Sequence, residues 1–539
     1  MKPKRAAKPA PAPTPQTPPS SSIVPFLEKH ALALALCFIA IAAIRIPLAY
    51  SQLGLTYDEP GHFACGLEYV AQHVYRYETQ HPPVARAMTA ILPYLAGARP
   101  SGNPDRENEG TGQIIHSKDP DRFVMLMRLG TLPFFVLASL VVFRWARRSF
   151  GGAAAVLATL LFTLVPPVLA HAGVATTDMG VTACLAAAFL AMLAWAESPD
   201  WRRAIVFGVA TAASVLTKFT ALGYFPITAG LALAAWWWVK RPSGAQVAEL
   251  AKARAATFAL AVAAGALTIW VVYFFSFAPF FDGIQSAFKH NAGGHLSYLL
   301  GEHSLTGWWY YFPVVLAVKT PLAFLILLAI GLWLAYRNRT RLEHLLPVAF
   351  SLGILVPAMT SHVNIGVRHI LPIYLGFSIT AAVGLVHLLE RVKAAAVVLV
   401  LWMAISGALA HPDYLAYFNE FGLGDKEAIL VDSDLDWGQS TKPLAHRLKE
   451  LGATSVNFGV RNGRSDYMQV WPGLPRIVPI NPAQPAEGWT AVSPTVDRTA
   501  QYGLYFRYPG RVPWFDTIEA KEHVGALRLY YVLPGTLPR

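Results

Sequence analysis

Two adjacent carboxylates, Asp58 and Glu59, follow the first long apolar run of the chain, residues 31–50. Pro60 comes next, and proline is favoured at the first position of a helix because its missing N–H is not needed there. We therefore expect both acids at a helix N-terminus, where backbone N–H groups favour negative charge and keep them ionised. A carboxylate pair at this position usually caps a helix, so a chemical role requires other groups nearby.

The same loop, residues 56–86, supplies such groups. His81 precedes two prolines, which impose a rigid break on the backbone, and Arg86 lies in the short amphipathic segment that follows, residues 84–95. The apolar spacing over residues 63–74 predicts a helix lying along the membrane surface. His-Pro-Pro alone is typical of a turn. Acids, a histidine and an arginine on one loop between two interfacial helices favour a functional site.

A second candidate loop carries Arg368 and His369, within the sequence NIGVRHILPIY. No acidic partner for Arg368 is evident in the neighbouring sequence. The forked N–H donors of a guanidinium match a phosphate group. This loop therefore predicts an anion-binding site at the entrance of an apolar run.

Three further charged residues lie at the ends of apolar runs: Asp178, Lys218 and Lys319. Asp178 would cap a helix or face a ligand. An unpaired ammonium at the edge of a bilayer is costly. Lys218 and Lys319 are therefore expected either to extend toward water or to bind a lipid phosphate.

Asp432, Asp434 and Asp436 form a D-x-D-x-D pattern. A calcium-binding EF-hand loop requires Gly at its sixth position and Glu at its twelfth, where this chain has Trp437 and Pro443. Capping at a strand–helix junction explains these acids better. We therefore expect no metal site.

The composition is that of a polytopic membrane protein. Of the 539 residues, 54% are hydrophobic and 14% charged, and the mean hydropathy is +0.40, which excludes an ordinary soluble protein. The net charge of +12 does not indicate nucleic acid, because the basic residues lie mainly in short loops between apolar runs. Cys37 and Cys184 fall within predicted spans, so the three cysteines form no disulfide framework.

At ~20 apolar residues per crossing, the hydropathy predicts about eleven transmembrane helices. They fall near residues 31–50, 125–143, 152–170, 179–196, 204–220, 221–238, 255–277, 312–336, 344–360, 370–389 and 393–410. Lys and Arg clusters precede the first span and follow the second, fourth, sixth, eighth and tenth. These clusters share one side, which the positive-inside rule makes cytoplasmic, so every candidate site residue lies on the outer side.

The fold class predicted is therefore mainly α, in three parts. Residues 1–26, rich in Pro, Ala and Ser, are expected to be a disordered cytoplasmic tail rather than a signal peptide. Residues 27–410 form the membrane domain. Residues 411–539 are expected to form an external α/β domain that folds independently and tunes acceptor choice. In this domain strands are predicted at residues 429–431, 455–460 and 527–533, and a helix at residues 441–451.

The first loop and the NIGVRHILPIY loop together resemble the GT-C superfamily of integral-membrane glycosyltransferases. The resemblance covers the chain to about residue 410 and is to the branch of protein O-mannosyltransferases and lipid A aminoarabinose transferases. It implies inverting transfer of a sugar from a polyprenyl-phosphate carrier to an acceptor hydroxyl on the outer face of the inner membrane. In that family an acid at the position of Asp58 is the catalytic base, and an acid at that of Asp178 faces the sugar-carrier pocket.

Glu59 is expected to belong to the catalytic pair with Asp58, where it orients the base or contacts a lipid or a loop cation such as Arg86. We expect the donor to be bound by His81, Arg86, Asp178, Lys218, Lys319, Arg368 and His369. No cofactor is required, because these cations can stabilise the leaving phosphate. A transporter or flippase is an alternative, although the repeated halves typical of such proteins are not evident. A non-catalytic membrane scaffold is another. The acceptor (protein, lipid A or another glycan) and the sugar stay open.

Overall fold

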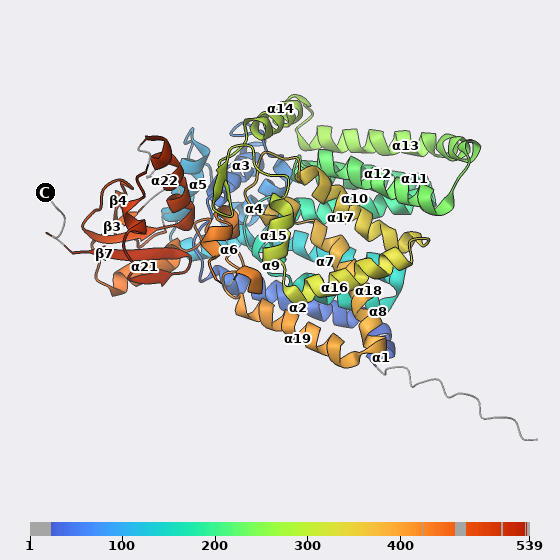
Figure 1. Cartoon of the computed structure of the whole chain (residues 1–539). Coiled ribbons are helices and arrows are strands. Elements are labelled where there is room, and N and C mark those ends of the chain that lie inside the picture. The colour runs from blue at the N-terminus through green and yellow to red at the C-terminus, as the bar shows by residue number, and fades with distance from the viewer. Residues whose placement is uncertain (1–22, 423, 459–470, 508–509, 534, 536–539) are drawn as a thin grey trace, which may run out of the picture.

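The computed structural model describes residues 23–422, 424–458, 471–507, 510–533 and 535. Most of the chain forms a helical bundle, and a small mixed sheet lies at one end of it (Figure 1). Residues 1–22 of the predicted tail lie outside the described residues. Its last four residues are helical, because α1 (Ile23–Lys29) begins there.

Each predicted span coincides with a helix or a bent pair of helices. They are α2 (Ala31–Tyr50), α7 (Leu132–Phe150), α8 (Gly152–Leu164) with α9 (Pro166–Ala172), α10 (Asp178–Glu197), α11 (Trp201–Thr217), α12 (Ala221–Lys240), α13 (Gly244–Val272), α15 (Tyr311–Lys319) with α16 (Leu322–Arg337), α17 (Leu342–Ala358), α18 (Ile373–Arg391) and α19 (Lys393–Leu409). In the described ranges, six helices are long and apolar enough to cross a membrane, or up to eight if each bent pair is one span. The chain is thus a multi-pass membrane protein, and the count of eleven crossings stays a prediction.

Both bends lie at prolines. The pair α8 and α9 is bent by 68° before Pro166, and the pair α15 and α16 by 116° at Pro321. Proline removes a backbone donor and restricts the residue before it, so a helix breaks there.

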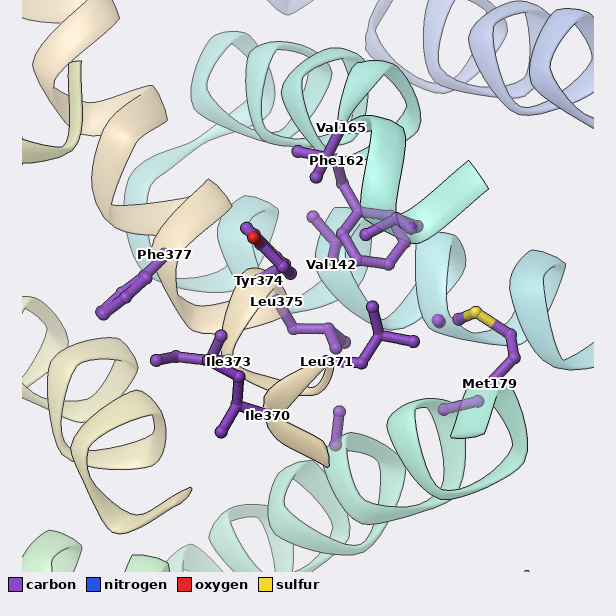
Figure 2. Packing of buried hydrophobic residues seen from close by; sticks show 14 of the residues in the cluster. Val142, Phe162, Val165, Met179, Ile370, Leu371, Ile373, Tyr374, Leu375 and Phe377 are labelled. Atoms are coloured by element: carbon purple, nitrogen blue, oxygen red, sulfur yellow. The ribbon is translucent and has the colours of Figure 1, made fainter. Parts of the chain in front are cut away.

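The packed centre of the bundle surrounds α18. Figure 2 shows Leu371 and Leu375 packed with Val142 of α7 and Phe162 of α8 in one apolar cluster. The 3₁₀ helix η1 (Val367–Ile370) leads directly into this cluster, with Ile370 fully buried. The bundle centre therefore anchors the loop that carries Arg368.

Four helices follow α2 before the next long helix: α3 (Glu59–Gln72), α4 (Pro83–Leu95), α5 (Arg106–Ile115) and α6 (Pro120–Leu129). The start of α3 and the extent of α4 agree with the sequence predictions. Residues 59–68 of α3 are all buried, because the helix packs against α4 and α5, and its position along the membrane surface stays a prediction. Its small residues permit this approach: a Cβ at Gly66 would overlap the backbone carbonyl of Arg86.

Two sheets complete the fold, besides α14 (Ala278–Gly293). The strands β1 (Ser297–Leu299) and β2 (Glu302–Ser304) form a hairpin. The larger sheet has the order β4-β3-β5-β7-β6, and β3 is parallel to β4 and β5 while β7 is antiparallel to β5 and β6. Its strands are β3 (Ser455–Phe458), β4 (Arg476–Pro479), β5 (Gly488–Val492), β6 (Glu522–Val524) and β7 (Leu527–Val532), and its helices are α21 (Thr441–Glu450) and α22 (Pro494–Arg507).

The predicted helix at 441–451 and the strands at 455–460 and 527–533 are present, with residues 459–460 outside the described ranges. The predicted strand at 429–431 is wrong. Residues up to Ile429 form α20 (Lys426–Ile429), which Asp425 caps by accepting the N–H of Ala428 at 3.0 Å. A short apolar run does not by itself distinguish a strand from the end of a short helix.

The segment that follows α19 contacts the helical bundle. Asn419 Nδ2 donates to the carbonyl of Thr320 at 2.7 Å, and Lys319 Nζ at the end of α15 donates to the carbonyl of Leu415 at 2.7 Å. Residues of the 411–440 segment therefore pack against the helical bundle, and the boundary at residue 411 and the external α/β domain stay predictions.

Candidate active site

A cavity of about 300 Å³ opens where the first loop, the start of α10, the end of α11, α14 and η1 meet. Of the residues singled out from the sequence, seven line it: Asp58, His81, Arg86, Asp178, Lys218, Arg368 and His369. Four separate stretches of the chain supply them. Glu59 and Lys319 do not line the cavity.

Asp58 and Arg368 form an ion pair at the cavity wall. Nη1 of Arg368 donates to Oδ2 of Asp58 at 2.6 Å. Asp58 is the N-cap residue of α3, but its side chain accepts no capping hydrogen bond and instead turns to the arginine. Burial raises the pKa of Asp58, but the charges of Arg368 and His62 outweigh burial and hold this pKa well below its ordinary value. The resting carboxylate is therefore ionised.

Besides its ion pair with Asp58, the Arg368 side chain contacts an aromatic ring and has one nitrogen without a hydrogen-bond partner among the described residues. Its Cζ lies 4.1 Å from the centre of the Trp437 ring, a cation–π contact. Its buried Nε has no hydrogen-bond partner among the described residues. An unsatisfied buried N–H of a cation is a donor suited to an anionic ligand.

His369, the next residue, also has an unpartnered buried nitrogen, Nε2, within the described part of the chain. Burial, followed by the charges of Lys218 and Arg368, lowers the pKa of His369 well below its ordinary value. A neutral imidazole at this place can donate or accept a single hydrogen bond.

Asp178 and Lys218 form another ion pair of the cavity wall. Nζ of Lys218, at the C-terminus of α11, donates to Oδ1 of Asp178, the first residue of α10, at 2.5 Å. The other oxygen of Asp178 accepts from the hydroxyl of Thr176 at 3.0 Å. Asp178, expected either to cap a helix or to face a ligand, and Lys218, expected either to extend toward water or to bind a lipid phosphate, thus form a buried pair that lines the cavity.

Arg86 holds the first loop together. Nε donates to Nδ1 of His62 at 2.9 Å, Nη1 to the hydroxyl of Tyr75 at 2.8 Å, and Nη2 contacts Glu78. Arg106 reaches the same Glu78 carboxylate at 2.6 Å. These contacts occupy Arg86 within the loop and support a structural role for it.

Sequence reasoning missed three residues of this cluster: His62, Glu78 and Arg106, all of which line the cavity. His81, by contrast, was expected, and its Nδ1 lies 3.4 Å from Glu78. Burial raises the pKa of Glu78, but Arg86 and His81 outweigh it and the pKa is lowered. Because Arg106 comes from α5, no spacing in the sequence connects it with Glu78.

Glu59 lies behind the cavity. Its carboxylate accepts from Nε and Nη2 of Arg128, both at 2.7 Å, and from the backbone N–H groups of Thr56 and Ala175, both at 2.8 Å. Glu59 was expected to orient Asp58 or to contact a lipid or a loop cation such as Arg86, and the cation that it contacts is Arg128 of α6. Glu59 therefore ties the Asp58 loop to α6 and to the segment before α10.

Lys319 is also buried away from the cavity. Its ammonium donates to the carbonyls of Leu415 and Asp434 at 2.7 and 2.5 Å and lies 4.4 Å from the centre of the Phe418 ring. These partners satisfy it without a lipid phosphate.

Asp434 and Asp436 of the D-x-D-x-D pattern accept backbone N–H groups, but neither caps the helix that begins at Thr441, whose N-cap residue is Ser440. Oδ1 of Asp434 accepts the N–H of Val367, the first residue of η1, at 2.9 Å. Oδ1 of Asp436 accepts the N–H of Gly438 at 3.2 Å. Among the described residues, no group of three or more His, Cys, Asp or Glu side chains is arranged to hold a metal ion.

Comparison with known proteins identifies a related family and a related fold. Residues 125–269 match the family model of dolichyl-phosphate-mannose-protein mannosyltransferases. Two solved structures of ArnT from Cupriavidus metallidurans share the fold. The apo structure is 21% identical over 74% of this chain and 68% of that chain, with a TM-score of 0.50. The structure bound to undecaprenyl phosphate is 17% identical over 94% of this chain and 100% of that chain, with a TM-score of 0.51.

A search of curated proteins finds no match. The predicted resemblance to GT-C membrane glycosyltransferases is confirmed.

Proposed function

We propose that this protein is an inverting glycosyltransferase that moves a sugar from a polyprenyl-phosphate carrier to an acceptor hydroxyl, with Asp58 as the general base. One observation carries the proposal: Asp58 and Arg368 form a 2.6 Å ion pair in a cavity that also holds the Lys218–Asp178 pair. A base and two cations thus face one space. The family match and the ArnT fold, one example of which holds undecaprenyl phosphate, support the choice of donor.

The carrier phosphate is proposed to bind between Arg368 and Lys218. The buried Nε of Arg368 has no hydrogen-bond partner among the described residues and would serve as a donor to the phosphate. The ammonium of Lys218 lies at the end of an apolar helix, where the phosphate of a membrane-embedded lipid would meet it. Fixed cations that receive charge developing on a leaving group are usually the largest electrostatic contribution to catalysis. We propose that these cations make a metal unnecessary.

Phosphate binding would also activate the base. In the resting pair, Arg368 keeps the pKa of Asp58 low, and a carboxylate with a low pKa is a weak base. A bound phosphate competes for the guanidinium and adds a negative charge beside Asp58, and both changes raise the pKa of the carboxyl. Asp58 would then be a stronger base when the donor is present.

The transfer step follows from these positions. Asp58 takes the proton of the acceptor hydroxyl while the hydroxyl oxygen forms a bond to the anomeric carbon. The bond from that carbon to the phosphate oxygen breaks, and its electron pair stays on the phosphate, facing Arg368 and Lys218. A single displacement of this kind inverts the configuration.

We propose that the site faces the outer side of a bacterial-type inner membrane, with the N-terminus cytoplasmic. Asp178 begins α10 at the cavity, while Glu197 at the other end of this helix pairs with Arg148 of the basic cluster at the C-terminal end of α7. A helix of 20 residues is about 30 Å long, which is the thickness of the hydrocarbon core of a bilayer. The cavity and the basic cluster would thus lie on opposite sides of the membrane.

The test is single-turnover transfer by the purified full chain, supplied with a panel of undecaprenyl-phosphate-linked sugars and with peptide, lipid A and glycan acceptors. Asp58→Asn preserves shape and removes basicity, so it should reduce turnover by about 10²–10⁴-fold while the variant still binds undecaprenyl phosphate. Equal turnover for Asp58→Asn and wild type would exclude Asp58 as the base. Carrier binding without transfer for any donor and acceptor would favour a flippase or a scaffold.

A further inference from the structure

Residues 432–441 lie between the two loops that carry Asp58 and Arg368. On one side, the N–H of Tyr57 donates to the carbonyl of Trp437 and the N–H of Gly54 to the carbonyl of Gln439, both at 2.8 Å. On the other side, the N–H of Val367 donates to Oδ1 of Asp434 at 2.9 Å. The segment thus contacts the neighbours of both members of the ion pair.

Trp437 contacts both loops at once. Its carbonyl accepts from the residue before Asp58, and its ring lies under the guanidinium of Arg368 at 4.1 Å. The side chain is 2% exposed and lines the cavity. Its own N–H donates to Oε1 of Gln439 at 2.8 Å, which fixes the local turn.

The contacts with the segment are close enough to require glycine in both loops. Gly366 has a φ of 133°, which glycine adopts without strain, and a Cβ there would overlap the hydroxyl of Ser433. This hydroxyl donates to the carbonyl of Ile365. On the other loop, a Cβ at Gly54 would overlap the hydroxyl of Thr441.

We infer that residues 432–441 are a positioning segment of the active site, and that Trp437 is its positioning residue, which holds Arg368 against Asp58. The inference rests on the proposed function, because it assigns the segment to the same ion pair. It also changes the role expected for the region after residue 411, from acceptor choice to alignment of the base and the phosphate-binding arginine. A displacement of about 1 Å in such a pair can reduce a rate by about 100-fold.

The informative variant is Trp437→Leu, which keeps an apolar side chain and removes the aromatic face. Trp437→Phe retains an aromatic face and should restore part of the activity. Trp489→Leu is the matched control, since the Trp489 ring packs on Tyr531 and Lys521 of the same C-terminal region. Size-exclusion and melting profiles establish that each full-length variant is folded.

The deciding measurement is the pH profile of kcat/KM. Three titratable or charged side chains act on Asp58: Arg368 of η1, His62 of α3, and His81 in the loop before α4. In Trp437→Leu a loosened Arg368 would let the pKa of Asp58 rise. We therefore expect kcat/KM to fall by about 10- to 100-fold and its acid limb to move to higher pH, with a smaller shift in Trp437→Phe and none in Trp489→Leu.

A lower kcat/KM with an unmoved acid limb would overturn the inference, because a purely structural loss scales the whole profile. Activity in Trp437→Leu equal to that of Trp489→Leu would also overturn it. If Trp437→Leu does not fold, Ser433→Ala removes the contact with Ile365 alone and is subject to the same two criteria. Absence of transfer by the wild type would instead contradict the proposed function.

Discussion

Glu59 and Arg128 form a bidentate ion pair inside the protein, with both N–O distances at 2.7 Å and both side chains no more than 2% exposed. The pair turns Glu59 away from the cavity, while Asp58, one residue earlier, faces it. Successive residues at the start of a helix point in different directions, so the two adjacent acids serve different purposes. Asp58 faces the ligand space, and Glu59 fixes the loop that presents it.

Removing one partner of this buried pair should destabilise the protein. Glu59→Ala leaves the Arg128 charge unpaired, which typically costs about 3–5 kcal/mol, and should lower the melting temperature of the detergent-solubilised chain. Glu59→Gln should be milder, because its amide oxygen still accepts from a backbone N–H. The double variant Glu59→Leu, Arg128→Met should recover much of the loss. A melting temperature for Glu59→Ala equal to that of wild type would contradict a stabilising role.

Arg368 should determine the affinity for the carrier. Arg368→Ala removes charge-assisted hydrogen bonds worth about 1.5–3 kcal/mol, so undecaprenyl phosphate should bind about 10- to 100-fold more weakly. Arg368→Lys should rescue only in part, because a forked donor becomes a point charge. Lys218→Ala should also weaken binding. Arg148→Ala, whose arginine pairs with Glu197 at the opposite end of α10, is the control. Binding by Arg368→Ala as tight as by this control would remove Arg368 from the phosphate site.

Asp436 should make stability depend on pH. Burial raises its pKa to about 6, above the ordinary value for an aspartate, so the folded protein binds a proton that the unfolded chain releases. Proton binding by Asp436 therefore stabilises the folded protein at low pH, and this contribution to the free energy of unfolding is lost as the pH rises toward 6. Asp436→Asn should flatten this part of the melting-temperature profile. Asp434 and Asp413, whose pKa values burial also raises, should leave a residual slope. An unchanged slope would contradict the assignment to Asp436.

Reporter fusions test the orientation. Fusions at Arg148 and Lys240 should report the cytoplasm, and a fusion at Arg539 should report the outer side, because the basic clusters stay inside. A cytoplasmic signal at Arg539 would contradict both the odd number of crossings and the outward-facing site.

Some features follow from the sequence alone because they depend on neighbouring residues. A long apolar run in a membrane protein must form a helix, since lipid offers no partner for backbone N–H and C=O groups, and the predicted spans coincide with the helices for this reason. The position of Asp58 at the start of α3 follows from Pro60. The likeness to GT-C proteins could be seen in two short loops.

Other features depend on how distant segments pack. Glu59 and Arg128 are 69 residues apart, and Asp58 and Arg368 are 310 apart, and no periodicity links such positions. The burial of α3 was missed because an amphipathic pattern does not show whether other helices cover the segment, as α4 and α5 do here. Trp437 and Asp434 were read as parts of a separate domain, since a change in composition marks where apolar helices end but not where the following chain packs. Only the tertiary structure brings this segment against the two loops. Its contacts are made by backbone carbonyls, by the ring of Trp437 and by the carboxylate of Asp434. Such contacts depend on the distance and orientation of the groups in space, which a linear sequence does not specify.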